Sequence, residues 1–294
     1  MKAPIFTGCG TAIVTPFTSD TVDYAALRRL IDFQLANDTD AIIVCGTTGE
    51  AATMSYVERM RTIETVVHHV DGRVPVIAGT GSNNTEAAIT LSKDAILAGV
   101  DGLLVVTPYY NKATQEGLRR HYTVIADLVS KPVILYDVPG RTGVKFTAET
   151  YAALSQHPNI LGVKEASGDF ALIQKTRELC PEDFYIWSGN DDETAAIMLL
   201  GGMGVISVAA NIVPREMQRL THLCLDGDFQ TAGKLQIKLR KLCEALFREV
   251  NPIPVKTALA EMGMCEDRLR LPLCEMGEEN RKYLKSVLAE YHLV

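Results

Sequence analysis

The sequence predicts an α/β protein, a (β/α)8 barrel (TIM barrel) followed by a C-terminal helical extension. Short, almost uninterrupted apolar segments alternate with longer segments of helical periodicity. Uninterrupted apolar strands are typical of parallel sheets that are covered on both faces. Eight such strand–helix units precede residue 228, which is the number that closes this barrel. An open doubly wound sheet is the alternative, but no G-x-G-x-x-G loop follows its first strand.

The expected strands are bounded by helical or turn-forming sequence. In chain order they are Thr11–Thr15, Ala41–Cys45, Pro75–Gly79, Gly102–Val106, Pro132–Tyr136, Ile160–Ala166, Phe184–Ser188 and Gly204–Ser207. Their length and composition fit buried parallel strands.

The expected helices lie between these strands. In the first, apolar residues recur at i, i+3, i+4 and i+8 from Leu27 to Leu35. The second begins with a capping box, Ser55-x-x-Glu58, in which both side chains can satisfy free backbone N–H groups. The other barrel helices are expected at Thr85–Ala98, Thr114–Val129, Thr147–Ser155, Ala171–Glu178, Asp191–Gly201 and Pro214–Asp226.

The pattern changes after Gly227. A long helix is expected over Phe229–Glu249, and the prolines that follow it end that helix. Two further helices are expected at Val255–Met262 and Glu278–Tyr291, with no strand between them. We therefore expect two domains, a catalytic barrel over residues 1–227 and a helical domain over residues 228–294.

The composition limits the partners and the compartment. The chain is 47% hydrophobic and has a net charge of −7, without a basic cluster, so we expect no nucleic-acid or membrane-surface role. No apolar stretch reaches the roughly 18 residues of a membrane span, and the N-terminus carries no targeting signal. The seven cysteines are odd in number and form no C-x-x-C pair, which indicates reduced thiols. These features predict a cytoplasmic protein.

Lys164 is the strongest chemical signal. Active sites of such barrels lie at the C-terminal ends of the strands, and Lys164 lies inside the apolar segment Ile160–Ala166. Alternation turns Leu161 and Val163 toward the helices and Lys164 toward the barrel interior, between two small neighbours. A neutral interior amine can attack a ketone and form a Schiff base. A structural lysine paired with a nearby carboxylate, Glu165 or Asp169, is the alternative, and position alone does not separate the two.

Tyr136 ends the neighbouring strand. Alternation places it on the face opposite Leu135, so it should point inward near Lys164. A phenol held there could act as a general acid and base in Schiff-base chemistry. An amphipathic core tyrosine is the alternative reading.

Two other features could bind a carboxylate. The turn Gly46–Gly49 carries the Thr47 and Thr48 hydroxyls and free backbone N–H groups, and Arg141 follows a Pro-Gly turn. A structural turn and a surface salt bridge are the alternatives. None of the six histidines lies in the expected strand-end loops, so we expect no catalytic metal, and without a G-x-S-x-G motif we expect no serine hydrolase.

Five motifs at the expected strand ends form a recognisable set. They are Gly46–Glu50, Val76–Gly81, Thr107–Asn111, Tyr136–Gly143 and Gly162–Gly168. In order and spacing they resemble the dihydrodipicolinate synthase family, within the N-acetylneuraminate lyase superfamily. The resemblance covers essentially the whole chain.

The resemblance implies a lyase of the class I aldolase type. Pyruvate would condense with L-aspartate 4-semialdehyde, with cyclisation and loss of water, on the route to diaminopimelate and lysine. Lys164 would form the Schiff base, without a cofactor or metal. Tyr136, Thr47 and Tyr110 would relay protons, with Tyr110 supplied by a neighbouring subunit of a homotetramer built as a dimer of tight dimers.

The resemblance also implies binding residues. Thr48 would bind the pyruvate carboxylate, and Arg141 the carboxylate of the aldehyde. Gly189 and Ile206 match positions that line the pyruvate pocket. Asp137 departs from the family, where Asn is common.

A regulatory cleft is implied at the tight-dimer interface, where some members bind lysine. Its expected residues are Ala52, Tyr56, Arg59, Asn83 and Tyr109. Tyr56 and Arg59 depart from the residues common in lysine-sensitive members, and Ala87 stands where they carry Glu. Because Arg59 should repel the lysine ammonium, and the carboxylate that would pair with it is missing, we expect weak or absent lysine feedback.

Two other functions remain open. A sister class I pyruvate aldolase, such as an N-acetylneuraminate lyase or a 2-keto-3-deoxy sugar acid aldolase, would share Lys164 and Tyr136. Arg141 and the loop Tyr109–Asn111 argue against it. A non-catalytic keto-acid-binding protein is the second alternative, although every expected catalytic position is filled.

Overall fold

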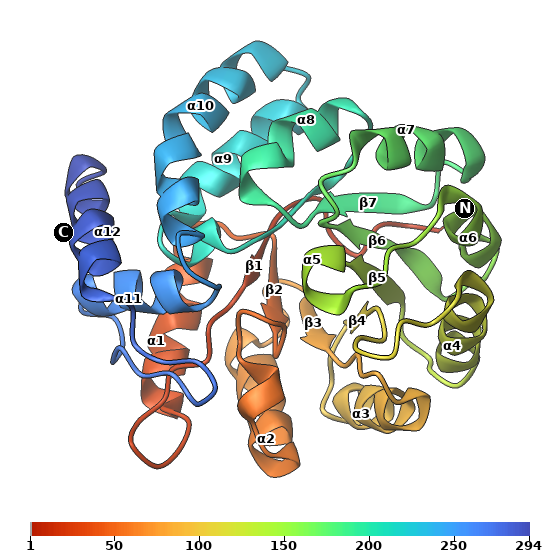
Figure 1. Cartoon of the computed structure of the whole chain (residues 1–294), viewed down its shortest axis with the longest axis horizontal. Helices are drawn as coiled ribbons and strands as arrows, with labels where there is room; N and C mark the ends of the chain where they lie inside the picture. The colour runs from red at the N-terminus through yellow and green to blue at the C-terminus, as the bar shows by residue number, and fades with distance from the viewer. Residues whose placement is uncertain (1) are drawn as a thin grey trace.

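Eight parallel strands form a closed barrel in the computed structural model, which describes residues 2–294 (Figure 1). Neighbouring strands follow the chain order, and β8 closes the barrel on β1. The fold class predicted from the sequence is therefore confirmed. The strands are β1 Gly8–Ala12, β2 Ala41–Val44, β3 Val76–Gly79, β4 Gly102–Val106, β5 Val133–Asp137, β6 Ile160–Glu165, β7 Tyr185–Ser188 and β8 Gly204–Ser207.

Helices surround the barrel in the view of Figure 1. They are α1 Tyr24–Leu35, α2 Tyr56–Val70, α3 Thr85–Leu97, α4 Gln115–Asp127, α5 Pro139–Thr142, α6 Ala148–Ser155, α7 Phe170–Leu179, α8 Thr194–Leu199, α9 Pro214–Leu225, α10 Phe229–Leu246, α11 Ile253–Glu261 and α12 Glu278–Glu290. Short 3-10 turns lie at Ala51–Thr53, Asp191–Glu193 and Ala209–Asn211. The predicted capping box is present at the start of α2, where Ser55 and Glu58 each accept the other's backbone N–H.

Two apolar clusters follow from the alternation of strand side chains. The inner cluster fills the barrel, where Phe6 stacks on the buried Trp187 with ring centroids 5.3 Å apart. The outer cluster lies between the strands and the helices. Leu135 belongs to the outer cluster and Tyr136 to the inner one, so the orientation predicted for β5 is confirmed.

The prediction for Leu161 was wrong. It belongs to the inner cluster, whereas we expected it to face the helices. The register between β5 and β6 shifts here, since Val133 pairs with Ile160 but Ile134 pairs with Gly162. Leu161 is the extra residue of this bulge, so strict alternation does not apply to it. Val163 faces outward as expected.

The first strand begins and ends three residues before the prediction, at Gly8–Ala12. Gly8 pairs with Gly204 where β8 closes the barrel. A Cβ on Gly204 would lie 1.9 Å from the Gly8 carbonyl oxygen, so the two backbones approach closely. The glycines that weaken the strand signal are thus needed at this seam.

The C-terminal helices pack on one side of the barrel. α10 contacts α8 and α9, and α12 packs on α10 and α11 (Figure 1). The chain between α10 and α11 passes Asn251, which is buried and reaches the loop after β2. The segment after residue 227 therefore contributes to the end of the barrel where the strands terminate. No helix of residues 2–294 has both the length and the apolar character that crossing a membrane requires.

Candidate active site

Lys164 and Tyr136 lie side by side at the C-terminal ends of β6 and β5. They are register partners, and the Lys164 Nζ lies 4.4 Å from the centre of the Tyr136 ring. Both side chains are buried. A Cβ on Gly189 would lie 3.1 Å from the Lys164 Cε, so the glycine leaves room for the lysine.

The two carboxylates that could have paired with Lys164 have other partners. Glu165 accepts the Ser167 N–H at 2.8 Å and the Tyr151 hydroxyl at 3.1 Å. Asp169 forms an ion pair with Lys145. Within the described residues 2–294, no carboxylate forms an ion pair with Lys164. This geometry favours a reactive amine over a structural ion pair.

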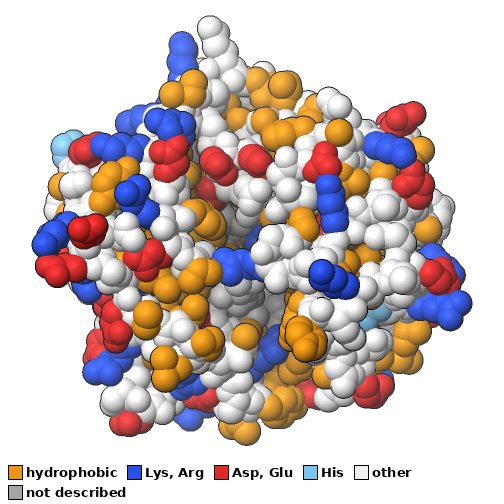
Figure 2. Space-filling view, viewed as in Figure 1, with side chains coloured by type: hydrophobic (Ala, Val, Ile, Leu, Met, Phe, Trp, Pro, Cys, Tyr) orange, Lys and Arg blue, Asp and Glu red, His pale blue; other side chains and the backbone are white. Residues whose placement is uncertain are grey.

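A cavity of about 360 Å³ opens at this end of the barrel. Figure 2 shows the hollow near the centre of the face, with Lys or Arg side chains at its edge. Thr47, Tyr136 and Arg141 all line it. The cavity thus brings together three of the eight predicted catalytic and substrate-binding residues.

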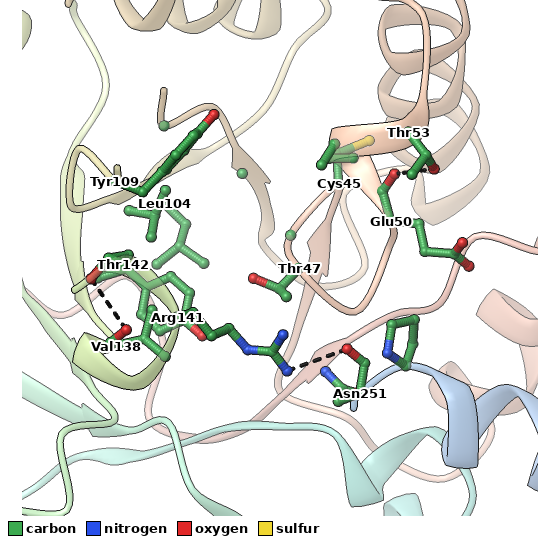
Figure 3. Close-up of a pocket in the computed structure, with 18 of the residues that line it drawn as sticks. Cys45, Thr47, Glu50, Thr53, Leu104, Tyr109, Val138, Arg141, Thr142 and Asn251 are labelled. Atoms are coloured by element: carbon green, nitrogen blue, oxygen red, sulfur yellow. Dashed lines mark hydrogen bonds between the residues drawn. The ribbon is translucent and has the colours of Figure 1, made fainter. Parts of the chain in front are cut away.

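Arg141 lies in α5 and extends across the cavity (Figure 3). Its Nη2 donates to the Asn251 carbonyl oxygen at 3.2 Å. The other guanidinium nitrogens have no recorded bond among the described residues and are available to a carboxylate. The predicted anion-binding role fits this placement.

The turn Gly46–Gly49 is held by its own backbone and by the C-terminal segment. Gly49 N donates to the Gly46 carbonyl at 3.1 Å. Thr48 is almost fully buried, and its Oγ1 accepts from the Asn251 Nδ2 at 3.0 Å. The sequence gives no signal for this contact, because nothing local connects Asn251, which lies in the segment that ends the long helix, to residue 48.

A buried ion pair continues this connection. The Lys256 Nζ lies 2.7 Å from the Glu50 Oε1, and both side chains are fully buried. Glu50 Oε2 also accepts the Arg270 N–H at 3.2 Å. Burial lowers the pKa of Lys256, against the opposing effect of Glu50. The pair fastens α11 to the loop that carries Thr47 and Thr48.

A pair of carboxyl groups directly follows Tyr136 and Lys164 in the sequence. Asp137 and Glu165 are the next register partners along the same strands, and both contact the Tyr151 hydroxyl at 3.1 Å. Burial, and then the charge of Glu165, raise the pKa of Asp137 to about 7. Burial likewise raises the pKa of Glu165. Two buried carboxylates this close repel each other, so ionisation of one disfavours ionisation of the other.

Two other predicted site residues, Ile206 and Tyr110, differ in their exposure to solvent. Ile206 belongs to the inner cluster on β8. Tyr110 is 88% exposed, has a backbone φ of 80° and does not line the cavity of its own chain. Such a side chain is free to contact another subunit.

The predicted regulatory residues are only partly brought together. Ala52, Arg59 and Tyr109 line the same cavity. Tyr56 lies away from it and donates its hydroxyl to Asp94 at 2.6 Å, and Asn83 is exposed. Burial lowers the pKa of Arg59, whose Nη2 donates to the Gly79 carbonyl while its buried Nε has no protein partner.

Metal ligands are not grouped in the described part of the chain. Residues 2–294 contain no cluster of three or more His, Cys, Asp or Glu side chains arranged to hold an ion. All seven cysteines are free thiols.

Comparison with known proteins identifies the family. The family model described as the dihydrodipicolinate synthetase family matches residues 5–291. The 4-hydroxy-tetrahydrodipicolinate synthase of Geobacter sulfurreducens is 52% identical over 99% of this chain and 100% of its own length. The dihydrodipicolinate synthase structure from Thermotoga maritima has a TM-score of 0.97 at 44% identity, covering 99% of this chain and 100% of that one. The corresponding Aquifex aeolicus structure has a TM-score of 0.97 at 45% identity, covering 98% and 99%. The chain belongs to the dihydrodipicolinate synthetase family.

Proposed function

We propose that this chain is a 4-hydroxy-tetrahydrodipicolinate synthase that condenses pyruvate with L-aspartate 4-semialdehyde. The observation that carries the proposal is Lys164, a buried amine that forms no ion pair with the described carboxylates and lies 4.4 Å from the Tyr136 ring. The family and the full-length relatives of that name support the choice of reaction. The reaction needs no metal or organic cofactor, since the lysine itself supplies the electron sink.

The first steps use Lys164 and Tyr136. The neutral amine attacks the C2 carbonyl of pyruvate, and loss of water from the carbinolamine leaves a Schiff base. Loss of a C3 proton then gives an enamine, whose carbon attacks the aldehyde. Tyr136 and Thr47 line the cavity and would move these protons. The amino group of the aldehyde then attacks the Schiff-base carbon and displaces Lys164 as the free amine, which closes the ring. The one water lost overall is that released when the Schiff base formed, so the product keeps its 4-hydroxyl.

The binding roles follow the charges of the substrates. Thr48 would hold the pyruvate carboxylate, and Arg141 the carboxylate of the semialdehyde. Gly189 leaves space beside Lys164, and Ile206 forms part of the apolar floor. A sister aldolase for sugar acids would have no need for an arginine placed as Arg141 is, so we rank that function second.

We also propose a cytoplasmic homotetramer in which Tyr110 completes the relay of a neighbouring subunit. Its 88% exposure and its absence from the cavity of its own chain support that role. Seven free thiols fit a reducing compartment. We keep the division into a barrel over residues 1–227 and a helical domain over residues 228–294 as part of the proposal.

Borohydride trapping tests the central assignment. Pyruvate and borohydride should leave one pyruvyl adduct on Lys164 by peptide mass spectrometry, and Lys164→Ala should leave none. A panel of aldehydes should then show turnover with L-aspartate 4-semialdehyde and no cleavage of sugar acids. An adduct on another lysine would refute the proposal, while an adduct without turnover of any aldehyde would favour a keto-acid-binding protein.

A further inference from the structure

Asn251 joins the C-terminal segment to both candidate carboxylate-binding groups. Its Nδ2 donates to the Thr48 Oγ1 at 3.0 Å, and its carbonyl oxygen accepts from the Arg141 Nη2 at 3.2 Å. The residue is 5% exposed and lines the cavity (Figure 3). One residue from outside the barrel therefore contacts two groups on different barrel loops.

The contact with Thr48 decides what its hydroxyl can offer to a ligand. An amide nitrogen can only donate, so the Thr48 oxygen must accept in this bond. The hydroxyl proton is not used in it, and no other bond of this hydroxyl is recorded among the described residues. A carboxylate can only accept, so a threonine in this state presents the donor that a carboxylate requires.

We propose that Asn251 is a positioning residue for the pyruvate carboxylate and acts through Thr48. The proposal rests on the proposed function, because pyruvate is its ligand. By occupying the oxygen of Thr48 as an acceptor, Asn251 directs the hydroxyl proton to the substrate. Since Asn251 does not touch the reacting carbon, its effect falls on pyruvate binding.

A second contact keeps Asn251 in place. The ion pair between Lys256 and Glu50 joins the same two segments a short distance further along each. The Lys256 Nζ also lies 4.3 Å from the centre of the Phe17 ring, which packs it from another side. These two buried connections hold the two segments together, so the Asn251 side chain stays within reach of Thr48.

The test measures the pyruvate concentration that gives half-maximal inactivation by borohydride, which requires no aldehyde. Losing a buried hydrogen bond that orients a charged contact should raise this concentration about 10-fold in Asn251→Ala. The kcat at saturating pyruvate should change far less. Asn251→Asp has nearly the same shape but cannot donate from its carboxylate, so it should raise the concentration further. Asn280→Ala, which removes an asparagine that contacts Glu249 away from the cavity, is the matched control and should leave this concentration unchanged.

A double-mutant cycle separates positioning from a general structural role. In a Thr48→Val background there is no hydroxyl to orient, so adding Asn251→Ala should have no further effect on the half-saturating concentration. A purely structural residue would shift both backgrounds by the same factor, which would overturn the proposal. So would wild-type pyruvate binding in Asn251→Asp, because the hydroxyl would then be the donor to residue 251. Absence of any adduct in the wild type would instead overturn the proposed function and this inference with it.

Discussion

Replacing Lys256 should lower the free energy of unfolding, because Glu50 would remain buried without its ion-pair partner. Its Nζ lies 2.7 Å from Glu50 Oε1, with both side chains fully buried. Removing one partner of a buried pair costs about 3–5 kcal/mol, because the other charge stays buried. Glu50 would keep the Arg270 N–H at 3.2 Å, so we place Lys256→Met at the low end, about 3 kcal/mol.

The pH dependence of this loss follows from the charge that remains. In Lys256→Met the folded protein favours a protonated Glu50, whereas the unfolded chain releases that proton above about pH 4.3. The folded state then binds more protons, so its stability falls as the pH rises, by up to about 1.4 kcal/mol per unit. The deficit of Lys256→Met should therefore be larger at pH 8 than at pH 5.

Urea unfolding followed by tryptophan fluorescence is a suitable assay, because Trp187 is the only tryptophan and is buried. Samples should have one protein concentration, since assembly adds to apparent stability. The double variant Glu50→Gln/Lys256→Met should recover most of the loss. Lys241→Met, which breaks a surface pair with Glu290, should leave the free energy of unfolding almost unchanged, because solvent screens an exposed pair. A cost below about 1 kcal/mol for Lys256→Met, or a double variant no more stable than the single one, would refute the reasoning.

Three other predictions address the site. Since the pKa of Asp137 is raised to about 7, the folded protein loses stability as the pH rises from about 4 to 7, and Asp137→Asn should remove that loss. Urea unfolding at pH 8 should then find the variant about 2–4 kcal/mol more stable, and equal stability would contradict the shift. Arg141→Ala should raise the KM for the semialdehyde about 100-fold, while borohydride trapping of pyruvate stays unchanged; a parallel loss of trapping would argue against separate carboxylate sites. Sub-millimolar lysine should leave the steady-state rate unchanged, because the Arg59 guanidinium, which lines the cavity, would repel the lysine ammonium, and inhibition in that range would contradict this expectation.

The barrel and its central lysine could be predicted because both depend on local patterns. Eight apolar segments with intervening helical periodicity indicate a (β/α)8 barrel, and an isolated lysine in one of them indicates the candidate nucleophile. The inward direction of Tyr136 followed from the same alternation. Alternation gave the wrong direction for Leu161, because the bulge there depends on the pairing of β6 with β5 and not on the residues of β6 alone.

Asn251 could not be found in the same way. Its partner Thr48 lies on the loop after β2, and the two meet only because α10 returns the chain to the end of the barrel. An asparagine before proline predicts a turn, which is also what the structure has there. The asparagine–proline sequence therefore accounts for the turn but gives no indication of the contact with Thr48.

Lys256 is a different case, because the sequence does contain a signal for it. A charged residue in a helix usually marks a solvent-facing side, but α11 is buried from Ile253 through Leu259. Its sequence is apolar on all sides apart from Lys256, Thr257 and the terminal Glu261, and a helix that is apolar all round is expected to be buried. A lysine in such a helix needs a partner, since lysine is almost never fully buried without one. The need for a carboxylate was therefore predictable, while its identity as Glu50 required the fold.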